Sequence, residues 1–266
     1  MDYYTLLILG AISGFTIYFG LIISRISILK DSTRYLLSSI ATGILIFLIY
    51  DVLSNSWGQY VEEAVVYSVH TGSGYGTTAL YLALFFTGLS LGVLGLSFYG
   101  ERMLKATAEQ GNESGSSYRF ALLIAIGIGT HNFGEGLAIG TSFAAGYIGL
   151  ATVLVIGFGL HNSTEGFGIL GPLIKDRKVP NGRFLLSAGL IGGGPTFLGT
   201  VIGSLWSSPS AEILFLSFAA GALIYVTLTM YKAIAPLCTG NRLMVGIFAG
   251  VVLGFLTDLI VSIGGA

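Results

Sequence analysis

The chain has 266 residues, of which 53% are hydrophobic and only 9% are charged. A water-soluble domain carries about 25% charged residues, so this composition excludes a protein with a water-compatible surface and indicates one that lies in a bilayer. The formal net charge of −1, without a basic run, gives no sign of a nucleic-acid partner, and the single cysteine, Cys238, excludes an internal disulfide. The N-terminus lacks a basic region before its apolar run, and that run is long enough to span, so no cleavable signal is expected.

The apolar runs predict the fold class. A helix needs about 20 consecutive apolar residues to cross the hydrocarbon core, and the chain contains eight such runs. We therefore expect an all-α polytopic membrane protein with a single transmembrane domain over residues 1–266, and we expect its two longest connections, 55–77 and 99–118, to be loops. The predicted spans are 4–24, 35–54, 78–98, 120–144, 148–171, 184–206, 211–231 and 243–264.

The positive charges predict the orientation. All 12 lysine and arginine residues fall in the connections between spans one and two, three and four, five and six, and seven and eight. The positive-inside rule makes that face cytoplasmic, so both termini are expected outside. The residues are Arg25, Lys30, Arg34, Arg102, Lys105, Arg119, Lys175, Arg177, Lys178, Arg183, Lys232 and Arg242.

The outer side carries acids and aromatic residues. Asp51 and Asp258 fall near the outer ends of spans two and eight, and acids without lysine or arginine would draw cations towards an entrance. Trp57 and Tyr60 are interpreted as ordinary interface anchors. Glu62, Glu63 and His70 in the connection 55–77 could capture a metal, although a solvated loop is the preferred interpretation.

Spans four and five repeat each other. The segment His131-Asn132-Phe-Gly-Glu135-Gly136 matches His161-Asn162-Ser-Thr-Glu165-Gly166 at an offset of 30 residues, on spans that run in opposite directions. A helix advances about 100° per residue, so the histidine and glutamate of each copy lie one turn apart on one face, and the asparagine lies on the other flank of the glutamate. If the two polar stripes face one another, they present two imidazoles, two carboxylates and two amide oxygens around one point.

This donor set is typical of a metal site. Two histidine nitrogens and two carboxylate oxygens form a plausible tetrahedral set for Zn²⁺, and the same ligands suit Fe²⁺, Mn²⁺, Co²⁺ or Ni²⁺ better than Mg²⁺ or Ca²⁺. The simpler interpretation is that buried polar residues join helices by hydrogen bonding. No lysine or arginine lies within any span, however, so Glu135 and Glu165 must be protonated or bind a cation. Thr130, Ser163 and Thr164 are expected to support the ligands with hydrogen bonds.

The flanking spans carry a weaker repeat. Gly14-Phe-Thr16 in span one matches Gly194-Pro195-Thr196 in span six, and Ala41 to Phe47 in span two resembles Ala219 to Tyr225 in span seven, at offsets of 180 and 178. Spans one to three are therefore predicted to recur as six to eight in inverted orientation, an arrangement typical of transporters. The run Gly192-Gly193-Gly194-Pro195 predicts a kink or a break with free carbonyls in span six.

The motif pair resembles the ZIP (Zrt/Irt-like) metal-transporter family, in particular its prokaryotic zinc-uptake branch. The resemblance extends over the whole chain in span count, outside termini and the 3+2+3 inverted-repeat arrangement, and is specific in spans four and five. It implies a homodimer that moves one helix bundle against another in the cell (inner or plasma) membrane, and no cofactor beyond the transported ion. By this resemblance the metal ligands are His131, Asn132, Glu135, His161, Asn162 and Glu165.

The chain departs from the family pattern at several positions. Gly134 and Thr164 replace the prolines of the two motifs, and Gly194 replaces a glutamate that completes a second metal site in some members. Thr229 and Met230 stand where acidic residues are expected in span seven. One principal metal with Glu135 and Glu165 as shared ligands is therefore expected.

These observations predict transport of a divalent cation, with zinc as the first candidate and iron, manganese, cobalt or cadmium as alternatives, and the resemblance implies uptake towards the cytoplasm. A proton- or sodium-coupled carrier of an organic solute would use the two glutamates but leave the paired histidines unexplained. An intramembrane metalloenzyme would need an open coordination position and a separate base, and the sequence places no further acid in the middle of a span. A metal-stabilised scaffold would bind tightly without flux.

Overall fold

The structure is a computed structural model that describes residues 3–25, 31–109, 113–175, 178–206, 208–238 and 241–263. These residues form helices and no strand, which confirms the all-α prediction for the described part of the chain. The first half contains α1 (Tyr3–Phe15), α2 (Ile17–Arg25), α3 (Asp31–Ser56), the π-helix η1 (Trp57–Glu62), α4 (Glu63–Thr71), α5 (Tyr75–Ser90), the π-helix η2 (Leu91–Gly95) and α6 (Leu96–Glu109). The second half contains α7 (Glu113–Ala144), α8 (Ile148–Lys175), α9 (Gly182–Leu205), α10 (Pro209–Ile234), the short 3-10 helix η3 (Ala235–Leu237) and α11 (Arg242–Ile263).

Seven helical stretches among the described residues are long and apolar enough to cross a membrane. They coincide with seven of the eight predicted spans; the last predicted residue, 264, lies outside the described residues. The predicted fifth span, 148–171, lies within helix α8, which has 28 residues but is not one of these seven stretches. The seven stretches are Tyr3–Arg25, Asp31–Thr71, Tyr75–Met103, Ser117–Ala144, Gly182–Leu205, Pro209–Leu237 and Arg242–Ile263.

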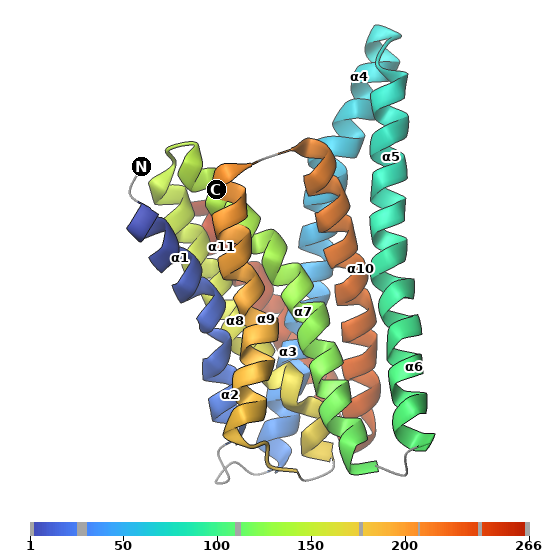
Figure 1. The fold of residues 1–266 in the computed structure, drawn as a ribbon, viewed down its shortest axis with the longest axis vertical. Helices are drawn as coiled ribbons and strands as arrows, with labels where there is room; N and C mark the ends of the chain where they lie inside the picture. The colour runs from blue at the N-terminus through green and yellow to red at the C-terminus, as the bar shows by residue number, and fades with distance from the viewer. Residues whose placement is uncertain are drawn as a thin grey trace.

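The two connections predicted as loops are largely helical, so that prediction was wrong. The helix that begins at Asp31 continues through η1 and α4 as far as Thr71, and it ends only where Gly72 adopts a left-handed conformation with φ 65°. Without a proline or a glycine pair, a polar composition alone does not end a helix. Helices α4 and α5 consequently form a hairpin that projects beyond the other helices at one end of the molecule (Figure 1). Likewise, α6 runs to Glu109 and α7 begins at Glu113.

Two spans differ from expectation in their continuity. The first is interrupted at Thr16, whose hydroxyl donates to the Ser13 carbonyl at 2.6 Å, between α1 and α2. Helix α9 instead continues without interruption through Pro195, so the glycine and proline run does not break the helix.

The helices pack as two groups. The first helix group comprises α1, α2, α7, α8 and α9, and the second comprises α3, α5, η2, α6, α10 and α11. Within each group glycines bring backbones together: a Cβ on Gly14 would strike the Gly193 carbonyl, and one on Gly136 would strike the Thr196 carbonyl. Between the groups, glycines face the ends of side chains instead. Examples are Leu216 opposite Gly134, Val261 opposite Gly157 and Met230 opposite Gly168.

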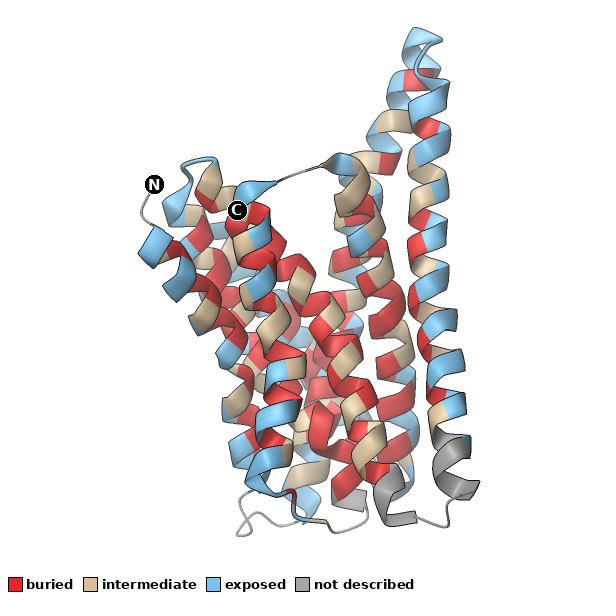
Figure 2. Ribbon diagram, in the orientation of Figure 1, coloured by how far each residue is buried: buried red, intermediate tan, exposed pale blue. Residues whose placement is uncertain are grey.

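Helix α7 lies at the centre of this arrangement. Its membrane-length stretch is 72% buried, whereas that of α11 is 17% buried. Figure 2 shows the same contrast between the buried residues in the middle of the molecule and the exposed outer faces. Polar residues on α7 are therefore shielded from lipid, where a functional site can form.

We expect Gly250→Ala to destabilise the fold without touching the polar motifs. An added Cβ at this position would strike the Ile40 carbonyl and the Cα of Gly43, and overpacking costs about 1–3 kcal/mol. Thermal unfolding in detergent micelles measures the effect. The control is Gly149→Ala, which adds a Cβ in open space and should leave the midpoint unchanged or raise it. Equal midpoints for both variants would show that the close crossing of α3 and α11 is unimportant.

Candidate metal centre

Helix α7 positions the first two polar residues of the site. The i,i+4 spacing of His131 and Glu135 places both side chains on one face, and Nε2 of His131 lies 3.0 Å from Oε1 of Glu135. Both residues are buried, with 3% and 5% exposure. The predicted neighbourhood of histidine and glutamate within one motif is therefore confirmed.

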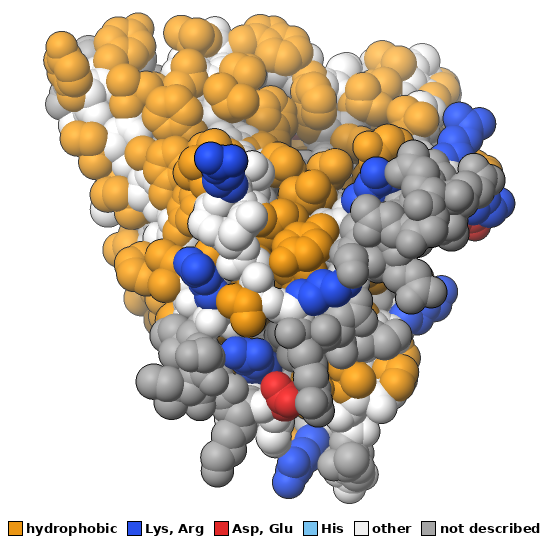
Figure 3. Space-filling view, turned by 60° about the horizontal axis from the view of Figure 1, so that its bottom comes forward, with side chains coloured by type: hydrophobic (Ala, Val, Ile, Leu, Met, Phe, Trp, Pro, Cys, Tyr) orange, Lys and Arg blue, Asp and Glu red, His pale blue; other side chains and the backbone are white. Residues whose placement is uncertain are grey.

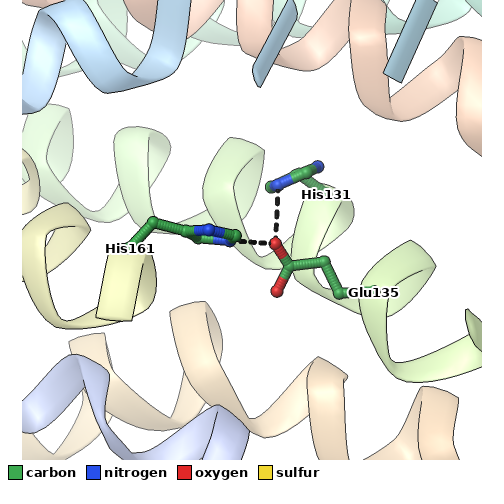
Figure 4. Close-up of side chains that lie close together, drawn as sticks. All are labelled: His131, Glu135 and His161. Atoms are coloured by element: carbon green, nitrogen blue, oxygen red, sulfur yellow. Dashed lines mark hydrogen bonds and ion pairs between the residues drawn. The ribbon is translucent and has the colours of Figure 1, made fainter. Parts of the chain in front are cut away.

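Helix α8 brings the second imidazole to the same oxygen. Nε2 of His161 contacts Oε1 of Glu135, so two histidines converge on one carboxylate (Figure 4). The two imidazole ring centroids are 6.1 Å apart. One ligand atom from each of the three side chains lies within 4.8 Å of the others. The two polar stripes thus face one another, which the sequence analysis had left as a condition.

The two asparagines hold flanking helices. The side-chain amide of Asn132 donates to the Gly192 carbonyl of α9 at 2.9 Å and to Oε2 of Glu165 at 3.2 Å. The amide of Asn162 donates to the Ser13 carbonyl of α1 at 3.2 Å. Each motif asparagine therefore ties its helix to a helix of the same group, and Asn132 also orients Glu165.

Several oxygen atoms at the site have no hydrogen-bond partner among the described residues. Leaving a buried polar atom unpaired costs about 1–3 kcal/mol, so this concentration of unpaired acceptors fits a cation-binding site. The atoms are Oε2 of Glu135, Oε1 of Glu165, and Oδ1 of Asn132 and Asn162.

The six predicted ligands thus fall into two sets of three residues. His131, Glu135 and His161 form the compact group that could hold a metal ion, with two nitrogens and one carboxylate oxygen. Glu165, Asn132 and Asn162 are equally buried but are not part of that group, and Glu165 accepts a hydrogen bond from Asn132. Imidazole and carboxylate ligands suit zinc and neighbouring transition metals.

A cavity of about 530 Å³ leads to the compact group from one end of the molecule. His131, Glu135 and His161 line its floor, and its wall continues to Ser142 and Ser262 near the ends of α7 and α11. The remaining polar side chains that line it are Asp51, Asn55, Gln59, Tyr60, Thr141, Glu212, Thr257 and Asp258.

The cavity wall contains residues that the sequence analysis missed. On α3 and η1, Gln59 donates to Asn55 at 2.9 Å and Asn55 donates to Asp51 at 3.1 Å, which orders a polar stripe along one helix face. The i,i+4 spacing of these three residues was a signal in the sequence. Tyr60, interpreted above as an interface anchor, lines the cavity and donates its hydroxyl to Glu212, so that interpretation was wrong.

The three hydroxyl residues expected to support the ligands do not do so. Thr130 donates to the Ile126 carbonyl, Ser163 to the Gly159 carbonyl and Thr164 to the His161 carbonyl. Serine and threonine in helices commonly bond back to carbonyls three or four residues earlier. The prediction from adjacency in sequence was therefore wrong.

Comparison with known proteins agrees with this chemistry. The family model described as ZIP zinc transporter matches residues 79–261, which is more than half of the chain and includes both motifs. No curated protein sequence matches the chain.

The compact group predicts zinc-dependent stability. At a free zinc concentration 100 times the dissociation constant, bound metal should add about 2.7 kcal/mol to the free energy of unfolding. Glu135→Gln removes the carboxylate on which both imidazoles converge and should abolish the zinc-induced rise in the unfolding midpoint. Glu62→Gln, an exposed glutamate on the projecting hairpin, should retain it. Equal stabilisation of both variants would place the metal elsewhere.

Proposed function

Since the chain belongs to the ZIP zinc transporter family, whose members transport metal cations and are not enzymes, we propose that its substrate is zinc or a closely related divalent cation, including iron, manganese, cobalt or cadmium. The proposed transport site is the group His131, Glu135 and His161, with Glu165, Asn132 and Asn162 as further ligands during passage. The observation that carries the proposal is the convergence of two imidazoles on one buried carboxylate at the floor of an open cavity. Membership of this family also argues against an organic solute and against a metalloenzyme.

The direction of transport is proposed to be inward. Nine of the twelve basic residues have described side chains. Figure 3 shows lysine and arginine side chains gathered at one end of the molecule. Helix α1 begins and α11 ends at the opposite end of the molecule (Figure 1), which supports eight spans with both termini outside. The cavity reaches that opposite end and carries Asp51, Glu212 and Asp258, whose charge would attract cations.

Matched contacts support the 3+2+3 inverted repeat. The amide of Asn132 holds α9 and that of Asn162 holds α1, which are the helices expected to correspond. In the second helix group, Gly43 of α3 meets Gly250 of α11, and Gly221 of α10 meets Gly92 of η2 in the same backbone-to-backbone manner. We propose that the two halves of the chain are inverted copies around the metal site.

The two kinds of packing suggest how access alternates. In the first helix group, glycines bring the backbones of neighbouring helices into direct contact, and backbone atoms cannot move aside as side chains can. Contacts between the groups involve flexible side-chain ends of residues such as Leu216 and Val261, which can rearrange. We therefore propose that the first helix group carries the bound metal past the second group. A homodimer in the cell membrane and a place in the prokaryotic branch are proposed from the family resemblance.

Metal flux tests the function directly. The purified protein in proteoliposomes loaded with a zinc-sensitive dye should admit zinc, and Glu135→Ala and His161→Ala should each abolish uptake because either change removes a ligand from the compact group. His70→Ala removes the remaining histidine, which is exposed on α4, and should transport at the wild-type rate. If the folded wild type moved none of zinc, iron, manganese, cobalt or cadmium, the proposal would be wrong.

Cysteine labelling tests the orientation. In a Cys238→Ala background, Ser262→Cys places a thiol in the cavity and Arg183→Cys places one at the start of α9 on the basic face. In intact cells an impermeant maleimide should label only the first variant, because the cavity opens outwards. Labelling of the second should require permeabilised cells. The reverse pattern would invert the proposed direction.

A further inference from the structure

Helix α8 presents two glycines on the inner side of the site. Gly168 and Gly171 follow Glu165 at steps of three residues, so each step advances about 4.5 Å along the helix and turns about 60° around it; this row of positions is called the glycine face. In the proposed orientation this face leads from the metal site towards the basic face. Because glycine has no side chain, the groups opposite the two glycines border the route directly.

The group opposite Gly168 is a thioether. A Cβ on Gly168 would lie 2.7 Å from Cε and 2.9 Å from Sδ of Met230, which belongs to α10 of the second helix group. Met230 is buried, with 2% exposure, and belongs to the main hydrophobic core. An apolar side chain such as leucine would fill this space equally well. What distinguishes methionine is its polarisable sulfur, which can serve as a soft metal ligand.

The group opposite Gly171 is an unpaired hydroxyl. Oγ of Ser38 on α3 lies 3.9 Å from the Cβ position of Gly171, is fully buried and has no hydrogen-bond partner among the described residues. Neighbouring hydroxyls in the same helix behave differently: Ser39 donates to the Tyr35 carbonyl at 2.8 Å and Thr42 to the Ser38 carbonyl at 2.9 Å. Since burial of an unpaired hydroxyl is unfavourable, this atom is available to bind a ligand.

Both groups lie outside the open cavity. Neither Met230 nor Ser38 lines it, whereas His131, Glu135 and His161 do. Met230 and Ser38 therefore belong to the packed layer between the metal site and the basic face. A cation that leaves the site along the glycine face of α8 meets the sulfur first and the hydroxyl one turn later.

We propose that Met230 and Ser38 are successive transient ligands on the inward release route, and that the Met230 thioether sets the preference for thiophilic cations such as zinc and cadmium over manganese. This inference rests on the proposed function, because it assumes inward release from the compact group. Thioether ligands favour softer ions, whereas manganese prefers carboxylate, carbonyl and water oxygens.

Met230→Leu tests the role of the sulfur. This change keeps the apolar volume and removes the ligand, so initial uptake of zinc and cadmium should fall about tenfold while uptake of manganese stays at the wild-type rate. Zinc binding at the compact group, measured by thermal stabilisation, should be unchanged. The control is Met244→Leu on the exposed face of α11, which should change neither the zinc-to-manganese nor the cadmium-to-manganese uptake ratio. An unchanged zinc-to-manganese ratio in Met230→Leu would show that Met230 only packs.

A second substitution at the same position shifts the preference in the opposite direction. Met230→Glu supplies hard oxygen ligands, and manganese uptake should rise relative to zinc. This variant provides an independent outcome should Met230→Leu fail to fold. A manganese-to-zinc ratio equal to that of the wild type would overturn the inference.

Ser38→Ala tests the second step against a matched neighbour. Removing the unpaired hydroxyl should slow zinc uptake, whereas Ser39→Ala, which removes a hydroxyl already bonded to its own helix, should leave the rate unchanged. Equal rates in the two variants would overturn the role of Ser38. Failure of the proposed function is distinguishable, because then the wild type itself would move no metal.

Discussion

The structure depends on the Glu135 carboxylate, which is buried at the centre of the helix bundle without a lysine or arginine nearby in sequence. A carboxylate in a membrane interior needs a counter-charge or a proton, and here two imidazoles approach one of its oxygens from α7 and α8. This arrangement requires α8 to come close to α7. It also requires a central position for α7, which the rest of the fold provides.

Glycine allows the close crossings around these two helices: Gly136 brings α7 against α9, and Gly166 brings α8 against α2. At crossings within each helix group a side chain on one helix would strike the backbone of the next, so Gly136 and Gly250 cannot be replaced without displacing a helix. At the boundary between the groups the partners are flexible side chains, as with Met230 opposite Gly168. The same residue type thus produces a firm contact where it meets backbone and an adaptable one where it meets side-chain ends. A transporter needs both, because the ligands must stay together while access to them changes.

The two ends of the helix bundle differ in charge. Carboxylates line the same cavity as His131, Glu135 and His161, and basic residues gather at the opposite face (Figure 3). An approaching cation is therefore attracted on one side, whereas on the other side the route is closed by an apolar layer. Hydrogen bonds among Asp51, Asn55 and Gln59 order the cavity wall, so its acceptors are positioned before a cation arrives.

The sequence by itself determined the all-helical class, seven of the membrane-length helices and the pairing of His131 with Glu135, because apolar length and i,i+4 spacing are local properties. It also identified the duplicated motif, and its family was confirmed by comparison. The sequence could not show that Glu165 is not part of the compact group, that Tyr60 faces the cavity, or that the connections 55–77 and 99–118 are largely helical. Only the tertiary structure decided these points, because they depend on which face of each helix meets a neighbour. The helix faces that meet are set by close helix crossings at glycines that lie far apart in the chain.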